Sequence, residues 1–215
     1  MSETNTTSTQ LAKLLSTKIC HDLAGPLGGM SNGVEFLSET IGDNDSIKQP
    51  LSLLALSSEE GAAKLQMFRQ AYGIINQVGE KTEISFLKEL FKNYFKHSRI
   101  EILWDENNLK AIDHRSRQAL VNLALIANTF LIMGGKIKIS LTYSDSLTIK
   151  IDAEGKQIKK DPDLIAILEN KASLDKITPN NSQAFFTIQL ISELGCTLKC
   201  DINDSVFSII IYKLP

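Results

Sequence analysis

The strongest pattern in the chain lies near its start, in residues 18–37, which read KICHDLAGPLGGMSNGVEFL. Apolar residues recur through and around this segment in steps of three and four: Leu11, Leu15, Ile19, Leu23, Leu27, Met30, Val34, Leu37 and Ile41. Such spacing is typical of an amphipathic helix with one buried stripe. We therefore predict a long helix from near Thr9 to Ile41.

His21 is the candidate reactive residue of this helix. It lies two positions from both Ile19 and Leu23, and at about 100° per residue this turns it about 200° away from the stripe, toward water. One ring nitrogen of an imidazole can attack phosphorus while the other holds a proton, and an adjacent carboxylate can orient the ring. His21 and Asp22 are therefore predicted to be catalytic, with Asp22 as the helper. The alternative is an ordinary surface histidine.

Small residues follow His21 and shape the helix beyond it. Gly25 and Gly28 leave the helix surface flat, so that the backbone of a partner protein can approach closely. Pro26 cannot donate to the carbonyl of Asp22 and is expected to bend the helix one turn beyond His21. Glycines cost about 1 kcal/mol each inside a helix. The alternative is therefore that this cluster breaks the element into two shorter helices.

A second helix follows and pairs with the first. Residues 42–45 predict a turn, and Asp45 or Ser46 can cap the next helix. The helical pattern then continues past Pro50 to Gly79. Two long helices joined by a short turn form an antiparallel hairpin. A lone hairpin cannot bury such wide apolar stripes, so we expect a homodimer that completes a four-helix bundle. Packing on the chain's own second domain is the alternative.

The remainder of the chain mixes helical and strand-like segments, after a linker expected at residues 79–83. The predicted elements are a helix over 86–95, a strand over 100–104, a helix capped by Asp113, a strand hairpin over 137–151, a helix over 183–194 that ends at Gly195, and strands over 198–202 and 206–212. The predicted fold class is α+β, with an antiparallel-rich sheet covered by helices. We expect three parts: a disordered tail over 1–8, the helical hairpin over 9–79 and the α/β domain over 84–215.

Composition narrows the class of protein. A formal net charge of -2, with no run of basic residues, argues against a nucleic-acid partner. The N-terminus lacks the pattern of a signal peptide, and no apolar run approaches the ~18 residues of a membrane span. We therefore expect a cytoplasmic protein with no membrane partner. The three cysteines are expected to be reduced thiols, and their spacing predicts no metal site.

The segment from His21 to Leu27 resembles the H-box of sensor histidine kinases, in which a phosphorylated histidine is followed by an acid and, five residues after the histidine, a proline. The longer run to Leu37 is most similar to the ChpT-type histidine phosphotransferases of alphaproteobacteria. That family pairs a kinase-like dimerisation hairpin with a degenerate kinase ATPase domain. The resemblance implies a phosphorelay carrier. The receiver domain of a hybrid histidine kinase would phosphorylate His21, and His21 would pass the group to the aspartate of a response regulator.

The resemblance also implies where these partners dock. Both receivers would use the same hairpin surface in turn, and Mg²⁺ would sit only on the partner receiver domain, so no cofactor is expected on this chain. The ammonium of Lys18 could offset phosphate charge. The predicted docking residues lie on or beside the His21 face of the helix: Lys18, Gly25, Pro26, Gly28 and Asn32.

Three motifs of the kinase ATPase domain are altered. The family pattern has NxxxN on a helix, DxGxG after a strand and a glycine-rich turn before the last helix, which together hold Mg²⁺ and phosphates. Here Ile126 stands at the Mg²⁺-binding position, residues 152–155 read DAEG, and residues 175–186 contain no glycine. We therefore predict an ATPase-like fold that binds no ATP and leaves Asp152 a structural role in a turn. An ATP-dependent kinase with a divergent site and a non-catalytic regulator that binds receivers or kinases are the alternatives.

Overall fold

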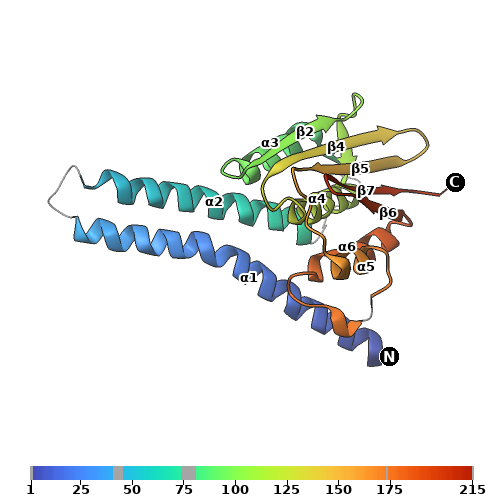
Figure 1. The fold of residues 1–215 in the computed structure, drawn as a ribbon, viewed down its shortest axis with the longest axis horizontal. Helices are drawn as coiled ribbons and strands as arrows, with labels where there is room; N and C mark the ends of the chain where they lie inside the picture. The colour runs from blue at the N-terminus through green and yellow to red at the C-terminus, as the bar shows by residue number, and fades with distance from the viewer. Residues whose placement is uncertain (1, 41–45, 74–80, 173, 215) are drawn as a thin grey trace.

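The chain forms a long helical hairpin that lies beside a layered α/β domain (Figure 1). The computed structural model describes residues 2–40, 46–73, 81–172 and 174–214, and the side chains of 2–7 and 174 are outside this description. The hairpin consists of α1, Ser2–Glu39, and α2, Lys48–Tyr72, which run antiparallel along each other. The predicted hairpin is therefore confirmed.

Helix α1 runs unbroken past Pro26, so the alternative of two shorter helices is wrong. Its start at Ser2 lies within the segment 1–8, which was expected to be a disordered tail. No Gly or Pro stands between Ser2 and Ala24 to stop the helix. Three expected features lie outside the described residues: the helix end at Ile41, the turn over 42–45 and the continuation of the second helix over 74–79.

Helix α1 meets α2 through small residues. A Cβ atom added at Gly29 would overlap Oγ of Ser57, and one at Gly33 would lie 2.7 Å from Cγ of Leu54, so both glycines permit close approach of the two helices. Leu27, by contrast, is 60% exposed. Val34 is 58% exposed as well. The prediction of a single stripe buried along α1 is therefore wrong at Leu27 and Val34, because the face toward α2 is centred on the two glycines.

Valine at Gly33 is expected to destabilise the hairpin, whereas valine at Gly28 is not. At Gly33 the added side chain would press on Leu54, and overpacking of this kind costs about 1–3 kcal/mol of unfolding free energy. At Gly28, which is exposed, no atom beyond the adjoining residues and the backbone of α1 lies within 4 Å of the same Cβ position. The free energy should therefore stay within about 0.5 kcal/mol of that of the unmodified chain. Chemical denaturation measures both variants, and equal losses would contradict this packing.

The α/β domain begins within the segment expected as a linker. Lys81–Glu83 forms β1, which pairs antiparallel with β3, Ala111–Asp113, in a two-stranded sheet. A three-residue strand shows no period of its own, and its partner lies far along the chain. The other elements are α3, Ile84–Phe95; β2, Ile100–Asp105; α4, His114–Thr129; β4, Gly135–Tyr143; β5, Leu147–Glu154; α5, Pro162–Leu168; the short 3-10 helix η1, Leu174–Lys176; α6, Ser182–Glu193; β6, Thr197–Ile202; and β7, Val206–Tyr212. The short α5 was not predicted.

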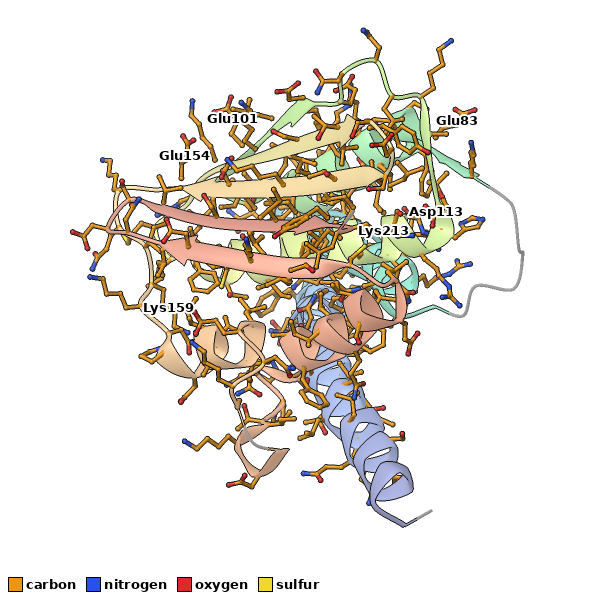
Figure 2. All side chains as sticks on the ribbon, turned by 90° about the vertical axis from the view of Figure 1, so that its right-hand side faces the viewer. Glu83, Glu101, Asp113, Glu154, Lys159 and Lys213 are labelled. Atoms are coloured by element: carbon orange, nitrogen blue, oxygen red, sulfur yellow. The ribbon has the colours of Figure 1, made fainter. Side chains whose placement is uncertain are left out.

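Five strands form the main sheet in the order β2-β4-β5-β7-β6, and β2 with β4 is the one parallel pair within the described part of this sheet. Helices α3, α4 and α6 pack on one face, and Phe91, Ile139 and Phe207 are among the core side chains between the layers. The opposite face is polar, with Glu101 and Glu154 at one end of the sheet (Figure 2). The α+β fold class is confirmed.

Two predicted helix boundaries are also confirmed. The carboxylate of Asp113 caps α4 and accepts hydrogen bonds from the backbone N–H groups of Arg115 and Ser116, each at 3.0 Å. Burial alone would raise the pKa of Asp113, but the Ser116 hydroxyl and these N–H groups outweigh it and hold the pKa below its ordinary value. Gly195 follows α6 with a φ of 63°, the left-handed conformation that ends many helices.

Candidate functional site

His21 lies on the exposed side of α1, as its spacing predicts. Its side chain is 86% exposed, and Nδ1 of the ring lies 3.5 Å from Oδ1 of Asp22. The other carboxylate oxygen of Asp22 accepts a hydrogen bond of 2.9 Å from Nζ of Lys18. One turn of helix therefore brings together an imidazole, a carboxylate and an ammonium group. We call Lys18, His21 and Asp22 the His21 site.

The Asp22 carboxylate lies beside one of the two ring nitrogens of His21, Nδ1. A carboxylate can only accept hydrogen bonds, so the contact at 3.5 Å favours the tautomer with the proton on Nδ1 and the lone pair on Nε2. Because the ring is exposed, an electrophile can reach Nε2 from solvent. The positive charge that a bond at Nε2 adds to the ring lies beside Asp22, which stabilises it.

Helix α2 and helix α3 supply the surroundings of Asp22. Nζ of Lys64, in α2, donates a hydrogen bond of 3.3 Å to the backbone carbonyl of Asp22. Burial, followed by the negative charge of Asp22, raises the pKa of Tyr72 and of Tyr94 above the ordinary range for a phenol. Both phenols therefore stay neutral, and the charged groups close to Asp22 include Lys18, Lys64 and Glu60, the partner of Lys64.

The predicted docking residues divide between two faces of α1. Three of them are exposed and lie along the same side of the helix as His21 by their spacing: Gly25, Gly28 and Asn32. Pro26 is instead buried, and a Cβ atom added at Gly61 of α2 would lie 3.3 Å from it. Its predicted place in the docking surface is therefore wrong, because one residue along a helix turns the side chain by about 100°.

In α4, the two residues at the position of an ATPase motif, Asn122 and Ile126, are buried inside the protein. Asn122 of α4 is fully buried, and its Nδ2 donates to the carbonyls of Ala71, at 2.8 Å, and Gln118, at 2.9 Å. Its Oδ1 accepts a bond of 3.3 Å from Gln183 of α6. Ile126 is 2% exposed within the core. The Asn122 amide therefore fastens α4 to the end of α2 and to α6.

Asp152 lies inside β5 rather than in the predicted turn. Its carboxylate accepts hydrogen bonds from Oγ of Ser208, at 2.6 Å, and from Nζ of Lys150, at 2.8 Å. Strand alternation places it on the polar face of the sheet, opposite to the face that the helices cover. Pairing with β4 and β7 extends β5 through Glu154, which a local reading of DAEG as a turn could not anticipate.

A cavity of about 210 Å³ opens between α2, α3 and α4, and Lys64, His97 and Asn128 are among its lining residues. Glu59 of α2 accepts hydrogen bonds from Lys96 and from Nε2 of His97, the latter at 3.0 Å. The bond from Lys96, followed by that from His97, lowers the pKa of Glu59. These contacts fasten the hairpin to the end of α3.

Other kinds of site have no counterpart in the described residues. No group of three His, Cys, Asp or Glu side chains there is placed to hold a metal ion. All three cysteines are unpaired in this structure. No helix within the described ranges is long and apolar enough to cross a membrane.

Lys64 is the residue of the site that sequence reasoning missed. It lies 42 residues from Asp22, and within α2 it shows only the ordinary i,i+4 ion pair with Glu60, at 2.7 Å. The pairing of the two antiparallel helices is the signal that identifies it. Gly29 of α1 faces Ser57 of α2. Asp22 lies about two turns before Gly29 and Lys64 about two turns after Ser57, so the two residues also face each other.

An exposed histidine beside an acid, on a helical hairpin joined to an α/β domain, is the arrangement expected of a histidine phosphotransfer protein. Comparison with protein families agrees with this class, since residues 86–206 match the family model described as the histidine phosphotransferase C-terminal domain. The match covers more than half of the chain, and the chain belongs to this family.

Similar proteins extend the match to the hairpin. The chain is 26% identical over 201 residues to protein phosphotransferase ChpT of Brucella abortus (strain 2308), covering 92% of this chain and 94% of that protein. A solved structure described as a bacterial phosphotransferase superposes with a TM-score of 0.80 at 24% identity, covering 95% of this chain and 96% of that chain. The histidine kinase AdeS of Acinetobacter baumannii matches at a TM-score of 0.47 and 17% identity, over 89% and 95% of the two chains.

Proposed function

We propose that this chain is the histidine phosphotransferase of a phosphorelay, which accepts a phosphoryl group from a receiver-domain aspartate on His21 and passes it to the aspartate of a response regulator. The observation that carries this proposal is the exposed His21 ring, whose Nδ1 faces the Asp22 carboxylate at 3.5 Å and whose Nε2 is accessible. Membership of the histidine phosphotransferase family supports it.

The chemistry needs only the His21 site and the receiver. Nε2 of His21 attacks the phosphorus of the receiver's aspartyl phosphate, and the bond from phosphorus to the carboxylate oxygen breaks as the bond to Nε2 forms. The receiver leaves as a carboxylate, which keeps the electron pair of the broken bond. The proton on Nδ1 stays hydrogen bonded to Asp22. In the second transfer a receiver carboxylate attacks the phosphorus, and Nε2 recovers its lone pair.

The proposed partners are receiver domains, one from a hybrid histidine kinase and others from downstream response regulators. They would dock on the exposed face of α1 that continues from His21 through Gly25, Gly28 and Asn32. The missing side chains at the two glycines allow the partner's backbone to approach closely. Lys18 stands beside the reacting ring, where its charge is shared between Asp22 and an incoming phosphoryl group. The Mg²⁺ of the reaction is proposed to sit on the receiver.

We further propose that the chain does not bind or hydrolyse ATP. Three features support this: Asn122 uses its amide within the protein, Ile126 offers no ligand atom, and Asp152 faces the polar side of the sheet.

A second copy of this chain is the proposed partner of the hairpin. Leu27 and Val34 of α1 are 60% and 58% exposed, and Leu51 and Leu65 of α2 are 49% and 52% exposed. Each pair is spaced at heptad intervals and so shares one side of its helix. Burying a fully exposed side chain of this kind contributes about 1.5–3 kcal/mol, and about half of that is available to a half-exposed one. A four-helix bundle of two hairpins provides this burial. Light scattering should give the mass of a dimer, and a monomer at micromolar concentration would overturn this proposal.

One transfer experiment tests the function itself. A receiver domain carrying labelled phosphate is mixed with the purified chain, and in parallel the chain alone is incubated with labelled ATP. We expect an acid-labile, base-stable label on the chain from the receiver and none from ATP. Self-phosphorylation with ATP would favour a kinase instead. Failure to accept label from several competent receivers would defeat the carrier function.

A further inference from the structure

Pro26, one turn after His21, leaves one backbone carbonyl of α1 without its usual hydrogen-bond donor. In a regular α-helix each carbonyl accepts from the N–H four residues later, so the carbonyl of Asp22 should accept from residue 26. Proline has no N–H to donate. Helix α1 nevertheless continues through Pro26, with the ring of Pro26 buried against α2 at Gly61. The carbonyl of Asp22 therefore needs a donor from outside its own helix.

Lys64 supplies that donor from the facing helix. Its Nζ lies 3.3 Å from the carbonyl oxygen of Asp22, and its side chain is only 26% exposed. Glu60, one turn earlier in α2, accepts a second bond from the same ammonium group at 2.7 Å. The ammonium group is thus held between the two helices, where it bridges the Glu60 carboxylate and the Asp22 carbonyl.

We infer that Lys64 is a positioning residue for phosphoryl transfer, because it takes the place of the N–H that Pro26 lacks and so fixes the backbone that carries Asp22 and His21. No contact joins Lys64 to the His21 ring among the described interactions, so its effect passes through Asp22. The side chain of Asp22 faces Nδ1 of His21 at 3.5 Å, and a shift of this backbone turns the carboxylate away from the ring. This inference rests on the proposed function.

A double-mutant cycle separates this role from a simple charge effect. The four proteins are the unmodified chain, Lys64→Met, Pro26→Ala and the double variant. At saturating receiver, Lys64→Met is expected to slow transfer to His21 about tenfold, the size of one hydrogen bond from a charged donor. Receiver affinity should stay within about twofold. Alanine at position 26 restores an N–H to the Asp22 carbonyl, so the same lysine change in the Pro26→Ala background should cost less than about twofold.

Two further variants serve as matched controls. Lys64→Arg keeps a charged donor at the same position and should restore most of the transfer rate. Glu60→Gln removes the neighbouring charge but leaves the ammonium on the Asp22 carbonyl, so its transfer rate should stay within about twofold of the unmodified chain. Thermal unfolding of the cycle reports the hydrogen bond independently of function, and a smaller loss of Tm from Lys64→Met in the Pro26→Ala background is expected.

The possible outcomes distinguish the inference from the proposed function. If Lys64→Met slows transfer equally in the unmodified chain and in Pro26→Ala, the positioning role is overturned, because the effect then comes from the charge of Lys64 alone. An unchanged transfer rate in Lys64→Met would overturn it as well. If the unmodified chain transfers no phosphate, the proposed function and the positioning role both fail. If the unmodified chain transfers normally but the effects of Lys64→Met and Pro26→Ala simply add, only the positioning role fails.

Discussion

His21→Ala is expected to abolish acceptance of phosphate from a phosphorylated receiver. The exposed side chain carries the proposed nucleophile, Nε2, and alanine has no atom that can form a bond to phosphorus. Removing a covalent nucleophile leaves no alternative route, so the labelled band should fall below detection. Receiver affinity should stay within about twofold, because the glycine face of α1 is unchanged. Labelled receiver and a direct binding measurement test both statements.

Cys20→Ala is the matched control for this result. Cys20 is the exposed neighbour of His21 on the same helix, and its replacement leaves the ring and Asp22 in place. Its transfer rate should stay within about twofold of the unmodified chain. Label retained in His21→Ala would assign the phosphate to another residue. Loss of receiver binding together with transfer would mean instead that His21 is a docking residue.

Gly25→Trp is expected to lower transfer on the order of 100-fold while the chain stays folded. Beyond the adjoining residues and the backbone of α1, no atom lies within 4 Å of a Cβ atom placed at Gly25, so the indole extends into solvent from the face of α1 that carries His21. A partner that uses this face is then displaced by several ångströms, and misplacement of reacting groups by even about 1 Å can cost 100-fold. Receiver affinity should fall with the transfer rate. Circular dichroism should show unchanged helix content.

Glu89→Trp places the same bulky side chain on α3 instead of on the proposed docking face of α1, and Glu89 is 59% exposed. This control should transfer at the rate of the unmodified chain. A normal rate in Gly25→Trp would show that receivers approach His21 from another side. Equal losses in the two variants would point to a general effect of an added tryptophan rather than to docking on α1.

Local pattern was enough for much of the fold and for the centre of the site. The outward direction of His21, the Asp113 cap and the alternation along β4 each depend on residues within one or two turns of the chain. Helix and strand periods repeat over such short distances, so they can be read without knowing the partner of each element. The neighbour of His21 in sequence, Asp22, is for the same reason its neighbour in space.

The tertiary structure decided which side of each element is used and what it meets. Sequence alone could not tell that Gly29 and Gly33 pack on α2 while Gly25 stays open, because this depends on how two helices are rotated against each other. It could not place Asp152 on the polar face of the sheet, since a shift of one residue in a strand reverses every side chain.

The position and direction of His21 can therefore be predicted from the sequence, whereas the contacts that hold its backbone depend on the tertiary structure. The helical period alone turns its ring to water and sets an acid beside it. The hydrogen bond from Lys64 to Asp22 joins residues that are 42 positions apart. Such a contact forms only when the two helices pack in one particular register. That register depends on the packing of both helix surfaces along their whole length and cannot be predicted from any short segment.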